Sequence, residues 1–202
     1  MKTLVMENGK VWVGAPKLER VMGIEHGLIV LRSRDKRLLH RLAATALLKN
    51  RDADAKTFYL YAAPDFLNAY AEFITKASQD LGIDWETLMQ TAHFSNFSTE
   101  SPTKMEEQWM RVEENAEDTR LVVLDSVGYH AGRDAYLVDR LNRLCYYKNA
   151  IGLVLDSSEE PNPTLERLAS VVVDLNARDH GGIEVFLRKH PRLPQTIFLM
   201  SG

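Results

Sequence analysis

An alternation of short apolar runs with segments of helical periodicity is the feature that most constrains the fold of this chain. The apolar runs are rich in β-branched or aromatic residues and occupy residues 28–31, 57–61, 92–94, 121–125 and 151–155. Between them, apolar residues recur at helical spacing, in the stripes Leu38, Leu39 and Leu42; Leu67, Tyr70, Phe73, Ile74, Ala77 and Leu81; Met105, Trp109 and Val112; and Leu137, Leu141, Leu144 and Cys145. This alternation predicts an α/β fold with a mostly parallel central sheet that helices cover on both faces.

The C-terminal part of the chain has a different pattern. Short strands are predicted at residues 171–176, 183–188 and 196–200, and turn-forming residues separate them, Gly181 and Gly182 first and residues 190–194 second. We expect these strands to extend the same sheet in antiparallel fashion. No repeat, low-complexity segment or interdomain linker is visible in the sequence, so we expect one domain over residues 1–202.

Composition excludes several classes of protein. With 45% hydrophobic and 26% charged residues, the chain is neither disordered nor collagen-like. A formal net charge of -3 gives no overall attraction to nucleic acid. No stretch approaches the roughly 18–20 apolar residues of a membrane span, and the N-terminus turns polar before a signal region develops. The only cysteine, Cys145, cannot form an internal disulfide, so we expect a core thiol in a reduced, cytoplasmic protein.

The connection after the first predicted strand limits the chemistry of the chain. Residues 32–37 join that strand to the next helix and contain neither a glycine nor a Gly-Lys-Ser/Thr ending. A phosphate cradle needs glycines, whose backbone lets successive N–H groups face the phosphates, together with a lysine and a hydroxyl for magnesium. We therefore expect that this connection does not wrap a triphosphate in the usual way.

Several short segments, taken in order, resemble the core of one family of ATPases. They are residues 18–27 (the approach to its first core strand), 58–60 (the second strand), 81–84 (the approach to the third strand), 120–127 (the Walker B strand), 149–155 (the strand that ends in a sensor) and 188–198 (a proline turn and the last strand). This family is the RecA/RadA recombinase superfamily, most closely the archaeal RadA and its small paralogue RadB. The resemblance implies a RecA-like core over nearly the whole chain.

Departures from that family imply a degenerate nucleotide site. The Walker A loop is shorter by about four residues, and Asp35 and Lys36 stand where the resemblance places the essential lysine and hydroxyl. Ala63 replaces the glutamate that activates water, and Ser157 replaces the sensor glutamine. Asp125 of the Walker B strand remains, and we expect it to form a buried hydrogen bond to the loop or helix start. The degenerate site comprises Arg32, Arg34, Asp35, Lys36, Arg37, Ala63, Asp125 and Ser157; no catalytic residue, bound ATP or other cofactor is expected.

The two loops that hold DNA in RecA-like proteins are short here. The second loop is acidic, with Asp156, Glu159 and Glu160, whereas affinity for a nucleic-acid backbone depends on Lys and Arg. Filament-type DNA binding is therefore not expected. The first loop keeps Tyr129 and Arg133, and two interpretations stay open: a plain surface loop, or a stacking and phosphate contact.

Basic residues gather at the end of the first strand and the start of the next helix, where open α/β sheets form a groove. They are interpreted either as a solvated rim or as a contact for an anionic group of a nucleic acid or an acidic partner. The same two interpretations apply to Arg140, Arg143 and Lys148 beside Tyr146 and Tyr147. The six histidines show no metal-ligand spacing, so no metal site is expected. The residues considered for anion or partner contact are Arg32, Arg34, Arg37, Arg41, Tyr129 and Arg133.

A retained core without its nucleotide chemistry favours a binding role. We expect a pseudo-ATPase, not an enzyme, that acts as a protein-binding accessory or scaffold in DNA recombination or repair. Its expected partner is an active RecA/RadA-type recombinase or a second copy of itself. Two alternatives stay open: an RNA- or DNA-binding inactive RecA-fold subunit of a ring assembly, like those of Elongator, and a KaiC-like regulatory protein with an unorthodox nucleotide site.

Overall fold

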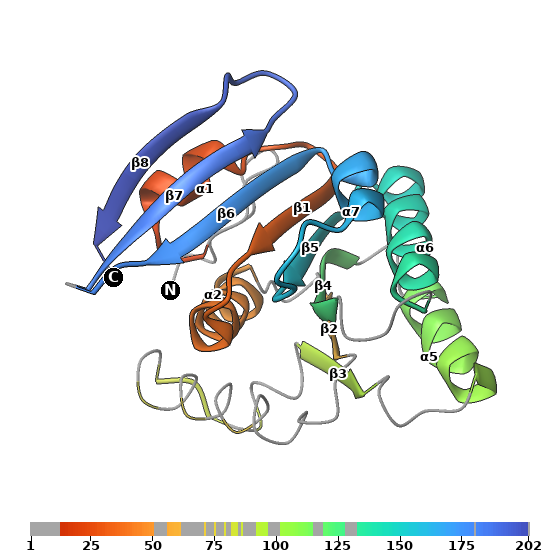
Figure 1. Cartoon of the computed structure of the whole chain (residues 1–202). Helices are drawn as coiled ribbons and strands as arrows, with labels where there is room; N and C mark the ends of the chain where they lie inside the picture. The colour runs from red at the N-terminus through yellow and green to blue at the C-terminus, as the bar shows by residue number, and fades with distance from the viewer. Residues whose placement is uncertain are drawn as a thin grey trace.

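One eight-stranded sheet organises the computed structural model of the protein (Figure 1). The structure describes residues 13–50, 56–61, 71, 75, 79, 82–84, 86, 92–96, 102–114, 119–127, 133–179 and 181–201. The strands are β1 (Gly27–Arg32), β2 (Lys56–Tyr61), β3 (Ala92–Asn96), β4 (Thr119–Val127), β5 (Ile151–Asp156), β6 (Val171–Ala177), β7 (Gly182–Lys189) and β8 (Thr196–Ser201). The helices are α1 (Pro16–Val21), α2 (Lys36–Lys49), α5 (Pro102–Glu114), α6 (Arg133–Lys148) and α7 (Pro163–Leu168).

The order of strands across the sheet is β3-β2-β4-β5-β1-β6-β7-β8. All pairs from β3 to β6 are parallel, and the pairs β6–β7 and β7–β8 are antiparallel. The predicted fold class, a mostly parallel α/β sheet with antiparallel C-terminal strands, is confirmed. β6 is the junction between the two parts, because it runs parallel to β1 and antiparallel to β7.

Helices cover both faces of the parallel part of the sheet. Alternate residues of a strand point to opposite faces, so Ile29 and Leu31 of β1 join the core that α1 and α2 cover, while Leu28 and Val30 join the core under α5, α6 and α7. Every residue of β1 and of β5 is buried for this reason. No helix among the described residues is long and apolar enough to cross a membrane.

The close approach of α6 to the sheet depends on a glycine in β5. A Cβ added at Gly152 would lie 2.6 Å from Cδ2 of Leu28, 3.0 Å from Cγ of Leu141 and 3.1 Å from Sγ of Cys145. Cys145 is fully buried there, and burial raises the pKa of its thiol to about 12. The prediction that Cys145 is a core residue is confirmed.

Two short helices lie outside the sequence prediction. In α7, the side chain of Asn162 accepts hydrogen bonds from the backbone N–H groups of Thr164 and Leu165, and Pro163 occupies the first turn. Before α1, the Oε1 of Glu19 accepts three backbone hydrogen bonds, from Val13, Gly14 and Ala15. The helix predicted from the stripe Leu67 to Leu81 lies almost entirely outside the described residues.

Candidate functional site

The three segments that carry the resemblance to a nucleotide site lie side by side. β5 is between β1 and β4 in the sheet, and all three strands run in the same direction, so their carboxyl ends share one edge. In open α/β sheets, ligands bind outside such an edge. We call this region the β1–β5–β4 edge. The predicted residues Arg32, Asp125 and Ser157 all lie at this edge or directly after it.

The connection from β1 to α2 consists of only three residues, Ser33, Arg34 and Asp35. Asp35 is the N-cap of α2, since its Oδ1 accepts a hydrogen bond of 3.2 Å from the backbone N–H of Leu38. Its own N–H donates to Oγ of Ser33 at 3.2 Å. A helix N-terminus is where a bound phosphate would accept backbone hydrogen bonds. Here a carboxylate of the chain accepts one of them.

Asp125, at the carboxyl end of β4, is 2% exposed and is held by two side chains from other elements. Its Oδ2 accepts a hydrogen bond from the hydroxyl of Tyr59 in β2 and lies 3.1 Å from Nε2 of His40 in α2. The ring of Tyr61 stands 6.1 Å from the ring of His40 and completes the group. The expected buried hydrogen bond of Asp125 is confirmed, with partners in β2 and in the second turn of α2. We call these four residues the Asp125 cluster.

Arg32 lies on the opposite face of the sheet, inside a group of acidic side chains. Its Nε is 3.0 Å from Oδ2 of Asp156, and its terminal nitrogens lie 3.3 Å from Oδ1 of Asp174 and 3.4 Å from Oε1 of Glu166. Arg188 adds a second cation, 3.3 Å from Glu166 and 3.5 Å from Asp174. Burial raises the pKa of Asp174, while Arg32 and Arg188 act to lower it. We call these five residues the Arg32 cluster.

The Arg32 cluster changes two sequence interpretations. Arg32 was grouped with the exposed basic residues, but it is 8% exposed and engaged by three carboxylates. Asp156 was grouped with an acidic loop, but it is fully buried and also accepts the backbone N–H of Ser158 at 3.0 Å. Glu159 and Glu160 are exposed, as that interpretation of the loop requires.

The remaining predicted site residues fall into two groups. Arg34, Lys36, Arg37 and Arg41 are exposed, and Ser157 is half-buried directly after β5. Arg37 and Arg41 line a hollow of about 440 Å³ together with Arg178 from the β6–β7 turn. Arg133 is the first residue of α6. Ala63 and Tyr129 lie outside the described residues.

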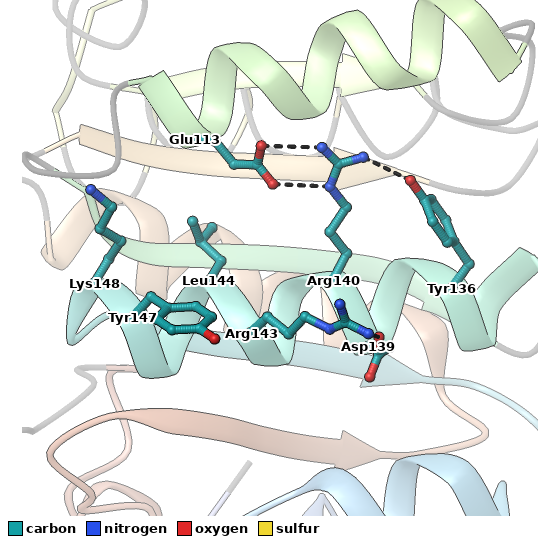
Figure 2. A pocket seen from close by; sticks show the side chains of 8 residues that line it. All are labelled: Glu113, Tyr136, Asp139, Arg140, Arg143, Leu144, Tyr147 and Lys148. Atoms are coloured by element: carbon teal, nitrogen blue, oxygen red, sulfur yellow. Dashed lines mark hydrogen bonds and ion pairs between the residues drawn. The ribbon is translucent and has the colours of Figure 1, made fainter.

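A second hollow, of about 620 Å³, lies between α5 and α6 (Figure 2). Arg140 spans it with two hydrogen bonds to Glu113, at 3.0 and 3.1 Å, and its guanidinium lies 5.5 Å from the ring centre of Trp109. These contacts, with Glu113 foremost, raise the pKa of Arg140, so this cation is used inside the protein. Tyr147, at 84% exposure, stands at the rim of the hollow with Lys148.

Several residues of the two clusters have no motif that marks them in the sequence. His40 and Tyr59 are separated from Asp125 by 85 and 66 positions, and only the sheet order and the place of α2 bring them together. One signal was available for the Arg32 cluster: Asp174 interrupts an apolar run, Val171 to Leu175, and a charge in such a run requires a partner.

The described residues contain no group of three or more His, Cys, Asp or Glu side chains that could hold a metal ion. The arrangement at the β1–β5–β4 edge is therefore one of side chains that satisfy one another. Comparison of the chain with protein-family models and with curated proteins found no match to either.

Proposed function

We propose that this protein is a non-catalytic relative of the RecA/RadA recombinases that acts as a binding accessory or scaffold in DNA recombination or repair. The observation that carries the proposal is the filled β1–β5–β4 edge. Asp35 caps α2 there, and Tyr59 and His40 hold Asp125. A nucleotide would need these same groups or the space beside them.

Charge at this edge also opposes a bound triphosphate. The carboxylate of Asp35 accepts a backbone N–H of the first turn of α2, so a phosphate would meet a negative group at the helix start. A connection of three residues without glycine leaves no cradle of backbone N–H groups. Asp125, a magnesium ligand by resemblance, has an oxygen already engaged by Tyr59 and His40. These contacts support a pseudo-ATPase without catalytic residues or cofactor.

Exposed basic residues next to the filled edge support a binding role. Arg34, Lys36, Arg37 and Arg41 stay at the surface, close to the hollow beside the β6–β7 turn. Fixed positive charge of this kind attracts an acidic surface and speeds association. We propose that the surface binds an acidic face of an active RecA/RadA-type recombinase in the cytoplasm, where the free thiol of Cys145 stays reduced.

Capture of the partner tests this proposal. A tagged chain is used to recover proteins from its native lysate, with and without nuclease, and the expected result is nuclease-resistant recovery of an active recombinase. A variant that combines Arg34→Glu, Arg37→Glu and Arg41→Glu should lose this recovery. Arg143→Glu, a reversal of an exposed charge on α6, is the matched control and should not. Recovery that the triple variant leaves unchanged would contradict the proposed surface.

One observation favours nucleic acid as a second candidate ligand. The exposed arginines of α2 and Arg178 face one hollow, and a nucleic-acid backbone binds to such groups of cations. RNA binding would fall steeply with salt, and the triple variant would flatten that dependence by roughly one counterion for each lost phosphate contact. Binding that is independent of salt would exclude this alternative.

A further inference from the structure

The outer face of β7 and β8 carries large apolar side chains that no described part of the chain covers. Ile183 and Val185 of β7 belong to the core, so the alternate residue Phe186 points to the opposite face. On β8, Ile197 is 64% exposed and Leu199 is 60% exposed. Figure 1 shows α1 behind these strands and no helix in front of them.

These apolar side chains form one continuous patch. Ile197 lies directly opposite Phe186 in the β7–β8 pair, and Leu199 lies two residues further along β8. We call Phe186, Ile197 and Leu199 the β7–β8 patch. Natural edge strands usually carry a charge, a proline or a bulge that discourages contact, but residues 196–201 contain no charged residue and no proline, and their pairing with β7 is regular. An exposed apolar surface of this kind is typical of an interaction site.

Charges of both signs border the β7–β8 patch. Glu184 and Arg188 lie on the same face of β7, two residues before and two residues after Phe186. Glu184 forms an ion pair with Arg178, and Arg188 lies 3.5 Å from Asp174. Two cations and two anions therefore balance around the patch. A strongly acidic or strongly basic partner gains little from such a border.

We propose that a second copy of this chain packs on the β7–β8 patch about a two-fold axis that passes near Phe186 and across β7. Such an axis places each residue before Phe186 against the residue equally far after it. Glu184 of one copy then faces Arg188 of the partner subunit, and the reverse contact repeats the pair. An axis along β7 would instead place Glu184 against Glu184 of the partner subunit, which like charge opposes. Charge complementarity thus selects both the occupant and the orientation.

Contact through the face, not through the free edge of β8, agrees with a contact at that edge. Nζ of Lys17 in α1 donates a hydrogen bond of 3.2 Å to the carbonyl oxygen of Leu199, so part of the backbone of β8 is already engaged. Lysine at a sheet edge discourages the addition of another strand. This contact between copies does not depend on the proposed function, since a chain that hydrolysed ATP would form it equally well.

Sedimentation equilibrium of the whole chain over a range of concentrations tests the proposal. The wild-type protein should dimerise, and Ile197→Lys or Leu199→Lys should raise the dimer dissociation constant about tenfold or more, because an apolar side chain loses its burial. Met110→Lys places the same change on α5, where Met110 is 51% exposed, and should leave dimerisation unchanged. Far-ultraviolet circular dichroism confirms that each variant is folded. A wild-type chain that stays monomeric, or a dimer that both patch variants leave unchanged, would overturn the proposal.

Complementary charge reversal tests the orientation. Glu184→Arg and Arg188→Glu should each weaken the homodimer, because each places like charges opposite one another. An equimolar mixture of the two variants should associate again, since the two cations of the Glu184→Arg chain would then face the two carboxylates of the Arg188→Glu chain. Failure of the mixture to associate more strongly than either variant alone would overturn the two-fold arrangement. ATP hydrolysis by the same samples reports separately on the proposed function.

Discussion

The two faces of the sheet hold buried carboxylates at the β1–β5–β4 edge in different ways. Under α2, Asp125 contacts a tyrosine hydroxyl and an imidazole. Under α7, Asp156 contacts the guanidinium of Arg32, a group that always carries a full charge. The first arrangement relies on hydrogen bonds between separate elements, and the second relies on ion pairs in a buried region. The free energy of unfolding should therefore depend on the two clusters to different degrees.

This difference also bears on what the edge replaces. By the resemblance, Asp125 stands where a magnesium ligand would be, and its contacts with Tyr59 and His40 give its carboxylate partners from the protein itself. Arg32 stands where the Walker A loop would begin, and it contacts the strands on both sides, β5 and β6. A three-residue connection is sufficient when the groups at its ends are fixed in this manner.

The largest effect is expected from Arg32→Leu. This change leaves Asp156, which is fully buried, and Asp174 without their central cation, so the free energy of unfolding should fall by about 3–5 kcal/mol. Chemical denaturation with urea measures the loss. Arg192→Leu, which removes an exposed pair with Glu25, is the control and should cost about 0–1 kcal/mol. Equal losses in the two variants would remove the distinction that we draw for the buried cluster.

A smaller effect is expected from Asp125→Ala. It removes the oxygen that both Tyr59 and His40 contact, and leaving buried polar groups without that acceptor should cost about 1–3 kcal/mol. Asp125→Asn keeps an oxygen in the same place and should cost less, which separates hydrogen bonding from charge. The same urea experiment measures both changes. An Asn variant as unstable as the Ala variant would show that the charge of Asp125, not its hydrogen bonds, holds the cluster.

The helix cap should contribute less than either cluster. Asp35→Ala removes the acceptor for the N–H of Leu38 and should cost about 1 kcal/mol, whereas Asp35→Ser keeps a capping oxygen and should recover most of it. Arg34→Ala changes the exposed neighbour and is expected to stay within about 0.5 kcal/mol of wild type. Thermal denaturation followed by circular dichroism ranks the three variants. A cap variant indistinguishable from Arg34→Ala would exclude Asp35 as a structural replacement for a phosphate.

The smallest effect is a change in pH dependence at Asp174. Burial raises the pKa of this carboxyl group in the folded protein, so between its ordinary value of 3.8 and the raised value the folded state binds more protons than the unfolded state. Its contribution to stability is thus present below pH 3.8 and is lost as the pH rises through the folded pKa. Relative to Asp174→Asn, the wild-type protein should lose stability from about pH 4 toward neutrality. A difference in the opposite direction would mean that Arg32 and Arg188 outweigh burial.

Much of the fold was predictable from the sequence because its elements have local signals. The strands correspond to runs of β-branched and aromatic residues, and the stripe of Met105, Trp109 and Val112 faces the core as its helical spacing requires. α1 and α7 were not predicted because a helix of six residues is too short to show a period. The turn-rich segment before α7 nevertheless contains a cap, Asn162 followed by Pro163, which signals a helix start.

The candidate site was predictable only in part because its contacts join distant parts of the chain. The absence of a phosphate loop and the burial of Asp125 could be inferred from neighbouring residues. The pairing of Arg32 with Asp156 spans 124 positions and depends on the parallel register of β1 with β5. A local count of charges placed Arg32 with the solvated arginines, whereas the sheet places it between three carboxylates.

Equilibrium binding of magnesium ATP to the purified chain tests the central claim, that the β1–β5–β4 edge is filled by the protein itself. Isothermal titration calorimetry, with thermal denaturation as a parallel measurement, should detect no binding and no rise in the melting temperature at millimolar ATP. A bound nucleotide would stabilise the folded chain in proportion to the logarithm of its concentration. A saturable rise in melting temperature that Asp125→Asn abolishes would contradict the claim, because the nucleotide would then occupy the place that Asp35, His40 and Tyr59 are described as filling.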